Sequence, residues 1–251
     1  MLKINYRVML LGFLLSYFAS SITHTKEYLT DFNFTTASVL PVFIYNNTKY
    51  IILAREAEGN SRGTYDDFGG GKEKNETHPL ITAAREFFEE GILHITTGLT
   101  IEQVQKYIDI NSAHNTIYII CYSRHENKKS ATYIVRFDRY KDDLLYNFND
   151  ALKQVSQASY KEKDRIAIVK WNIVKRAMAQ NKDVKNITVK ACVVHPKMGV
   201  LTKKYIKLRS CFVKKLRSFF LNKPYKRLHK KIRLYDQAEI STCKPMLKSY
   251  P

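Results

Sequence analysis

The sequence has 251 residues, of which 45% are hydrophobic and 26% are charged. This composition excludes a chain that is disordered throughout, a collagen-like chain and a repeat polymer, and it predicts one domain of catalytic size with appendages. The 42 Lys and Arg outnumber the 23 Asp and Glu, so the formal net charge of +19 favours polyanionic partners, namely nucleic acid, nucleotides or an anionic membrane.

The N-terminal segment has the pattern of an export signal. Lys3 and Arg7 both precede an apolar run over residues 8–18, and residues 19–21 are small, as a signal peptidase requires. We expect residues 1–21 to be a cleaved signal peptide or a short anchor, which places the protein in the secretory pathway or at a membrane. The alternative is an N-terminal helix packed on a cytoplasmic domain.

Two runs of β-branched and aromatic residues, 37–45 and 49–54, predict a β-hairpin, because the Asn-Asn-Thr sequence between them is turn-forming. Residues 57–78 are polar and Gly-rich and predict a loop. A helix is expected from Pro79, where apolar residues recur at steps of three and four. Thr77 is the expected cap of this helix, and Gly91 its expected end.

The rest of the chain predicts further strands and helices in alternation. They are expected as a short helix over 100–107, strands over 116–122 and 131–137, a polar helix over 142–157, a strand over 165–171 and a helix over 173–180. This order predicts an α+β fold, an α/β/α sandwich in which a mixed β-sheet is covered by helices on both faces.

Three carboxylates are placed on one face of the predicted helix. Glu86, Glu89 and Glu90 stand at positions i, i+3 and i+4. Like charges at such positions destabilise a helix by about 0.2–0.5 kcal/mol per pair. A hard divalent cation such as Mg²⁺ would turn this repulsion into attraction, and the glycines at 69–71 would let the backbone approach both metal and phosphate. The alternative is a solvated acidic face beside Arg85.

The same segment resembles the Nudix hydrolase family, whose box runs G-x5-E-x7-R-E-U-x-E-E-x-G-U, where U is a bulky apolar residue. The sequence REFFEE at 85–90 matches the R-E-U-x-E-E core at every fixed position. Gly70 and Glu76 have the G-x5-E spacing. The resemblance covers about residues 35–180 and implies a Nudix-like sandwich.

The box departs from the family pattern at two places. Eight residues instead of seven separate Glu76 from Arg85, and Gly91 follows Glu90 directly. An extra loop residue is easily absorbed, because the closure entropy of a loop changes slowly with its length. The part of the box that forms the helix is intact.

The resemblance implies divalent-metal-dependent hydrolysis of a pyrophosphate bond in a nucleoside diphosphate linked to another moiety, with capped RNA among the candidates. Mg²⁺ or Mn²⁺ would lower the pKa of the attacking water and orient the phosphates. The implied metal ligands are Glu86, Glu89, Glu90 and the carbonyl of Gly70. The implied catalytic residues are Glu89, Glu90 and Glu162, the last as the general base from the loop before the strand over 165–171. Arg85 and Glu76 would support the site, and Lys72, directly after the glycines, could contact a substrate phosphate or be plain surface.

The excess positive charge is concentrated at the C-terminus. Residues 201–251 contain 15 Lys and Arg against Asp236 and Glu239. We expect a basic, partly helical tail over 196–251, because apolar residues recur at helical steps between residues 203 and 223. Three interpretations stay open for it, which are binding to the RNA backbone, binding to an anionic membrane, and packing on the domain with solvated lysines.

Two other functions compete with hydrolysis. The departures from the box would suit a non-catalytic nucleotide- or RNA-binding protein on a Nudix scaffold. The two ends of the chain would suit a membrane or host-interaction protein.

Overall fold

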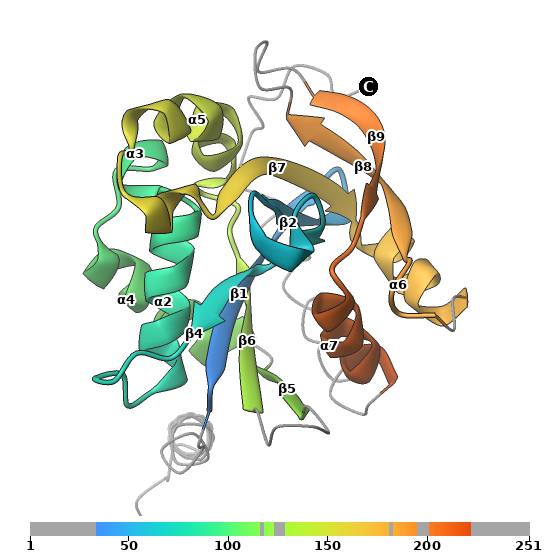
Figure 1. Cartoon of the computed structure of the whole chain (residues 1–251), viewed down its shortest axis with the longest axis horizontal. Coiled ribbons are helices and arrows are strands. Elements are labelled where there is room, and N and C mark those ends of the chain that lie inside the picture. Colours follow the sequence, from blue (N-terminus) through green and yellow to red (C-terminus); the bar gives the residue numbers. More distant parts are fainter. Residues whose placement is uncertain (1–33, 116–117, 123–128, 181–182, 195–200, 222–251) are drawn as a thin grey trace, which may run out of the picture.

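Figure 1 shows the computed structural model of the chain, which describes residues 34–115, 118–122, 129–180, 183–194 and 201–221. The strands are β1 (Thr36–Tyr45), β2 (Thr48–Glu56), β3 (Tyr65–Asp66), β4 (Phe68–Gly71), β5 (Tyr118–Tyr122), β6 (Lys129–Arg136), β7 (Lys163–Lys170), β8 (Thr188–Val194) and β9 (Leu201–Lys207). The helices are α2 (Pro79–Glu90), α3 (Leu93–Thr96), α4 (Ile101–Asn115), α5 (Lys141–Gln154), α6 (Trp171–Gln180) and α7 (Ser210–Leu221), with short 3-10 turns at Gly59–Ser61 and Ala158–Lys161.

Within the described residues, nine strands form one mixed sheet in the order β5-β6-β1-β2-β7-β8-β9, with β3 paired to β2 and β4 paired to β1. β1 and β6 run parallel, while the other paired strands are antiparallel. The predicted hairpin is present as β1 and β2. Its turn residues Asn46 and Asn47 have φ angles of 46° and 56°, which is the backbone of a type I′ turn.

Helices cover both faces of the sheet, as the sequence predicts (Figure 1). α2, α4 and α5 pack on one face, and α6 and α7 on the other. Successive side chains of β7 point to opposite faces of the sheet. Ile166 and Ile168 belong to the hydrophobic core under α2, α4 and α5, and Ala167 and Val169 to the core under α6 and α7. The α+β sandwich is therefore confirmed.

The domain continues beyond residue 180, where we expected its end. β8 pairs with β7 and β9 with β8, so the sheet takes up two further strands. The helix predicted from residue 203 is wrong over 203–207, because this stretch pairs with residues 188–192 of β8 and buries Ile206. α7 buries Phe212 and Phe219 on the sheet, so up to residue 221 the basic tail packs on the domain.

The predicted start of α2 at Pro79 and its end at Gly91 are confirmed, while the residue that caps its start is not the one predicted. His78 caps it instead of Thr77, since its Nδ1 accepts a hydrogen bond from the Leu80 N–H at 3.1 Å. Gly91 follows the last turn with a right-handed backbone, and the left-handed residue is Ile92, with φ 51°. Glycine is needed at 91 for space, because a Cβ there would lie 2.7 Å from the Phe87 carbonyl oxygen.

The two ends of the chain cannot be compared with their predictions. The candidate signal at 1–21 and the basic residues 222–251 lie outside the described residues, so export and tail binding stay predictions. Among the residues that are described, no helix combines the length and the apolar character needed to cross a bilayer.

Candidate active site

The Gly-rich strand β4 lies so close to β1 and α2 that two of its positions leave no room for a side chain. A Cβ on Gly69 would lie 2.6 Å from the Ala37 carbonyl oxygen. A Cβ on Gly70 would lie 2.6 Å from Cδ of Glu86, at the centre of its carboxylate. The glycines therefore bring backbone directly against a carboxylate of α2.

Because of this close approach, alanine substitutions at Gly69 and Gly71 should have different effects on the free energy of unfolding. Gly69→Ala is expected to lower the free energy of unfolding by about 1–3 kcal/mol, because the backbone of β1 would have to move. Gly71→Ala is the matched control, since a Cβ there meets nothing within 4 Å. Urea denaturation measures both variants, and equal stability of the two would contradict the close packing of β4.

Arg85 ties the Gly-rich segment to the acidic helix. Its Nε donates to Glu76 Oε1 at 2.8 Å, its Nη1 to Glu86 Oε1 at 2.8 Å, and its Nη2 to the Gly71 carbonyl at 2.8 Å. A longer contact of 3.5 Å joins Nη1 to Glu89 Oε2. Strand, loop and helix are thus held by one guanidinium, whose planar fork of donors suits several acceptors at once.

Glu76 contacts Arg85 although eight residues separate the two in the sequence, one more than in the Nudix box. Its Oε2 also accepts hydrogen bonds from Thr82 Oγ1 at 2.6 Å and from the Glu73 N–H at 2.8 Å. Burial by itself raises the pKa of Glu76. These donors and Arg85 lower the pKa by more than burial raises it, so the pKa lies below its ordinary value. Glu76 is therefore a charged partner of the clamp.

Glu86 and Glu89 leave the site with excess negative charge, because a single guanidinium faces them and Glu76. Burial raises the pKa of Glu86 to about 7 and also raises the pKa of Glu89, in both cases against the influence of Arg85. The turn before β7 lies beside α2, where the ring centroids of Tyr160 and Phe88 are 6.5 Å apart, and the charge of Glu162 raises both pKa values further. Glu162 itself is exposed.

Glu90 is buried and already has partners for both of its oxygens. Its Oε2 accepts the Gly69 N–H at 2.6 Å, and its Oε1 lies 3.1 Å from Nζ of Lys163. Lys163 is 1% exposed and also donates to Glu56 Oε1 at 2.6 Å. Burial raises the pKa of Glu90 well above its ordinary value, and the ammonium of Lys163 opposes this shift.

A second buried lysine, Lys215, reaches the same region from α7. Its Nζ donates to both oxygens of Asp67 at 2.8 Å and to Ser38 Oγ at 3.2 Å. Burial raises the pKa of Asp67, but Lys215 and the hydrogen bonds with Asp66 and Ser38 together bring the pKa below its ordinary value. Between the two lysines, Arg209 pairs with Glu56 at 2.7 Å.

Sequence reasoning missed these cations. Lys163 opens an apolar strand and looks like a solvated end residue. Lys215 gave a usable signal, because it lies three residues after Phe212 and four before Phe219, in the middle of the apolar face of α7. A lysine at such a position must find a buried acidic partner.

The predicted metal ligands do not form one complete set. The described residues contain no group of three His, Cys, Asp or Glu side chains placed to hold a metal ion. Glu86, Glu89 and the backbone of Gly70 fit a hard cation, because they are oxygen donors with uncompensated negative charge. Glu90 does not fit in this arrangement, since Lys163 and the Gly69 N–H occupy its oxygens.

Lys72 lies on the exposed loop after β4. Its ammonium stands 4.7 Å from the centre of the Phe34 ring, and its N–H donates to the Thr35 carbonyl at 2.9 Å. The backbone of Lys72 thus continues the pairing of β4 along β1, while its side chain lies at the surface of the site.

Comparison with known proteins adds structural likeness without sequence likeness. Neither a scan of protein-family models nor a search of curated proteins found a match. Among solved structures, a MutT/nudix family protein from Enterococcus faecalis is 13% identical, with a TM-score of 0.40 over 88% of this chain and 70% of that one.

Two further solved structures are similar at the same level. The C. elegans Ap4A hydrolase is 9% identical, with a TM-score of 0.31 over 81% of this chain and 97% of that one. The NUDIX domain of Shewanella oneidensis NrtR, complexed with ADP ribose, is 12% identical, with a TM-score of 0.30 over 58% of this chain and 81% of that one. Because the TM-scores are below 0.5, the function is argued below from the site alone.

Proposed function

We propose that this chain is a Nudix-type hydrolase that uses a divalent cation to cleave a pyrophosphate bond in a nucleoside diphosphate linked to another moiety. The observation that carries the proposal is the Arg85 clamp. It joins the Gly-rich strand β4, the loop residue Glu76 and the acidic face of α2 in one arrangement. A helix that only had to be soluble would have no use for buried, mutually repelling carboxylates.

In this proposal Glu86 and Glu89, with the carbonyl of Gly70, would hold Mg²⁺ or Mn²⁺. When bound, the cation lowers the pKa of a water and neutralises charge on the phosphates. Arg85 orients Glu86 and Glu89. Glu90 is a positioning residue, because its carboxylate fixes the N–H of Gly69 and hence the path of β4.

Glu162 is the proposed general base, and Lys72 a proposed phosphate contact. The carboxylate of Glu162 lies close enough to α2 to raise the pKa of Glu86 and Glu89, and it is exposed to solvent and substrate. Its carboxylate would accept the proton of the attacking water. Lys72 would offer its ammonium to a substrate phosphate from the loop that follows β4.

One observation favours a second candidate function, a non-catalytic nucleotide- or RNA-binding protein. The ion pair of Lys163 with Glu90 places a protein ammonium where the resemblance implies a metal ligand. A scaffold that had lost catalysis could keep its fold by this pair, since a buried carboxylate needs a cationic partner.

Hydrolysis assays combined with thermal melts separate the two functions. A panel of nucleoside diphosphate derivatives and capped RNA is incubated with and without Mg²⁺ or Mn²⁺, and the products are identified. The hydrolase proposal expects turnover with the cation and a rise in melting temperature on adding it, because a ligand that binds only the folded state stabilises it. Absence of both effects would leave the binding function.

Glu162→Gln is expected to lower turnover by about 100-fold or more, because general bases typically contribute 10²–10⁴-fold. The rise in melting temperature with Mg²⁺ should persist, since Glu162 is not a proposed ligand. Lys161→Gln, a charge change at the neighbouring exposed position, is the control. Loss of the metal-induced shift in Glu162→Gln would show that this residue binds the cation instead.

The basic residues after α7 make a separate prediction about partners. Residues 222–251 hold eight Lys and Arg and two acidic residues. Their removal should leave hydrolysis of small nucleotides unchanged, but weaken RNA binding and flatten its dependence on salt. Removal after residue 198 should instead unfold the domain, because β9 and α7 belong to its sheet and core. Filter binding at several salt concentrations measures the first effect and circular dichroism the second. Equal salt slopes for the full chain and the chain ending at 221 would exclude RNA binding by this segment.

A further inference from the structure

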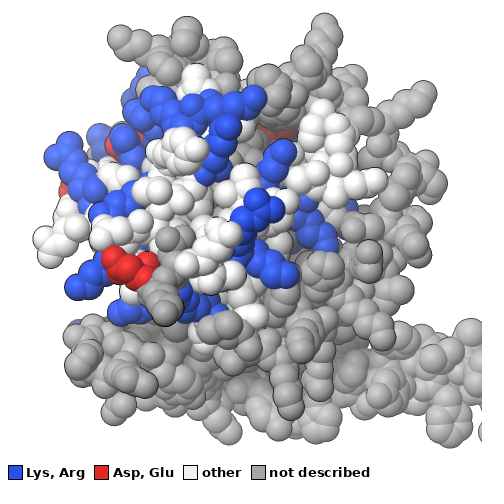
Figure 2. Space-filling model, turned by 90° about the vertical axis from the view of Figure 1, so that its right-hand side faces the viewer, with Lys and Arg blue, Asp and Glu red and all other residues white. Residues whose placement is uncertain are grey.

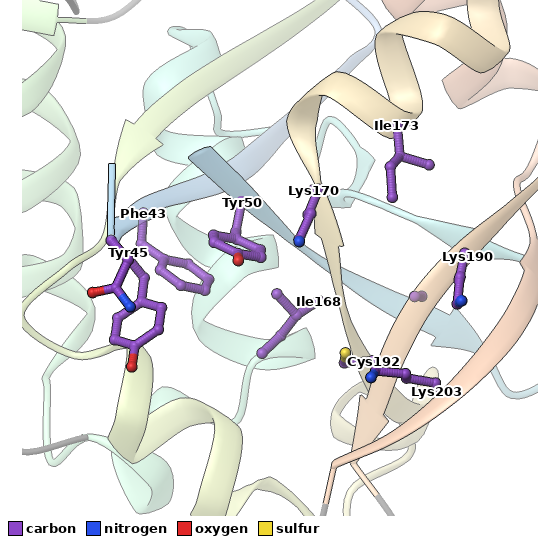
Figure 3. A pocket seen from close by; sticks show the side chains of 11 residues that line it. Phe43, Tyr45, Tyr50, Ile168, Lys170, Ile173, Lys190, Cys192 and Lys203 are labelled. Carbon is purple, nitrogen blue, oxygen red and sulfur yellow. The ribbon is translucent and has the colours of Figure 1, made fainter. Parts of the chain in front are cut away.

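A pocket of about 520 Å³ is lined by residues of β1, β2, β7, β8 and β9 (Figure 3). β7 and β8 pair only at Ala167 with Val193 and at Ile168 with Cys192. Beyond these pairs the two strands part, and the pocket lies where they do, reaching Lys170 on β7. Lys170 is seven residues along β7 from Lys163, or about 20 Å at the rise of a strand. The pocket is therefore separate from the proposed hydrolytic site.

Three lysines give this pocket a positive charge. Lys170, Lys190 and Lys203 line it from three successive strands, and none of the described residues that line it is acidic. Within the described part of the chain, none of the three has an ion-pair partner. Ammonium groups gathered in a concave site without acidic partners attract an anion.

The surrounding face of the molecule strengthens this field. The described residues from Trp171 onward hold eleven Lys and Arg, of which Arg209 and Lys215 are paired with carboxylates, and one acidic residue, Asp183. Figure 2 shows Lys and Arg side chains spread over the described part of this face, with few acidic ones between them. An anionic ligand approaching the pocket would meet positive potential from the start of its encounter.

Aromatic side chains form the other end of the pocket. Figure 3 shows Phe43, Tyr45 and Tyr50 on one side and Lys190 and Lys203 on the other. The rings of Phe43 and Tyr50 are stacked, with centroids 5.2 Å apart and an angle of 11° between their planes. Phe43 is 4% exposed, so it is the partly exposed rings of Tyr45 and Tyr50 that offer a flat apolar surface to a planar group, and nucleic-acid bases stack on surfaces of this kind.

We infer that this pocket binds one phosphate-bearing nucleotide, as a second site distinct from the carboxylates of α2. The base would lie against the aromatic end and the phosphate between Lys190 and Lys203. The pocket volume falls within the range of about 300–1,000 Å³ that is usual for small-ligand sites. A free mononucleotide and a single nucleotide of an RNA strand present this same chemistry.

Calorimetric titration of the full chain in EDTA tests the inference without depending on hydrolysis, because no divalent cation is then available to the carboxylates. The probes are AMP, ATP and a short single-stranded oligoribonucleotide. The double variant Lys190→Gln, Lys203→Gln should bind at least about tenfold more weakly, since hydrogen bonds to charged groups contribute more than the 1.4 kcal/mol that tenfold represents. Lys204→Gln is the matched control, being the neighbouring exposed lysine of β9 that does not line the pocket.

Alkylation of Cys192 reports on occupancy of the same pocket. Cys192 lines the pocket and is a free, partly buried thiol, so the rate of its alkylation is compared with and without nucleotide. A saturating nucleotide should slow alkylation of Cys192, as read by peptide mass spectrometry.

The outcomes are decisive in each arm. Absence of binding by all three probes, equal affinity of the double variant and Lys204→Gln, or unchanged alkylation of Cys192 at saturation would overturn the inference. Binding of AMP and ATP with protection of Cys192 identifies a mononucleotide site. Binding of the oligoribonucleotide alone, with the same protection, identifies a strand site. Glu89→Gln should bind the probes as the wild type does, so a failure of hydrolysis leaves this test intact.

Discussion

Replacing Glu89 by Gln is expected to remove nearly all divalent-dependent hydrolysis, with a loss of at least about 100-fold in turnover, the scale on which preorganised electrostatic groups act. The substitution removes a hard anionic ligand and keeps the shape of the side chain. The rise in melting temperature with Mg²⁺ or Mn²⁺ should shrink with it. Without metal, the variant should be as stable as the wild type or slightly more stable, because one of several like charges on α2 is gone.

The control for this prediction is Asp150→Asn on α5. Asp150 is exposed and pairs only with Lys153, three residues away on the same helix. The same change from carboxylate to amide there should affect neither turnover nor the metal-induced shift. A solvated acidic face on α2 predicts that Glu89→Gln behaves like Asp150→Asn, so full activity of Glu89→Gln would refute the metal site.

The elements that the sequence predicts well are those specified by neighbouring residues. The hairpin of β1 and β2 is encoded by Asn46 and Asn47, which adopt the left-handed backbone of its turn. α2 is encoded by its apolar spacing and by Pro79 in its first turn. In each case the signal lies within a few residues of the structure that it specifies, and no distant contact is required to read it.

The elements predicted wrongly are those decided by distant contacts. Residues 203–207 have apolar positions that also suit a helix, and pairing with β8 selects the strand. Once β9 is part of the sheet, α7 must pack on the second face, where Phe212 and Phe219 are buried. Pairing across the sheet is invisible in local spacing, so the sequence predicts a basic tail where the described part of the domain has its last strand and helix.

The site shows the same division. The clamp residues Arg85 and Glu76 come together as the box implies, because the loop between them absorbs one extra residue. The surroundings of Glu90 are set by Lys163, which lies more than seventy residues away in the sequence and follows from the register of β7 on β2. The spacing of the box contains no information about that contact.

Lys163→Met is expected to cause the largest loss of stability, about 3–5 kcal/mol, because it leaves the buried Glu90 without its cation, whereas Glu56 keeps its pair with Arg209. Lys153→Met is the control, since the exposed pair of Lys153 with Asp150 should contribute no more than about 1 kcal/mol. Urea denaturation of both variants gives the comparison.

The same variant also decides what Glu90 does. Adding Glu90→Gln to Lys163→Met should recover part of the lost stability, because the neutral amide no longer requires a buried cation. If Glu90 can accept a metal ion when the ammonium is absent, Mg²⁺ will raise the melting temperature of Lys163→Met more than that of the wild type, by the linkage of binding to folding. If Glu90 only positions Gly69, the two shifts will be equal, because Glu86 and Glu89 are the ligands in both proteins. A Lys163→Met variant as stable as Lys153→Met would contradict the buried ion pair from which both expectations follow.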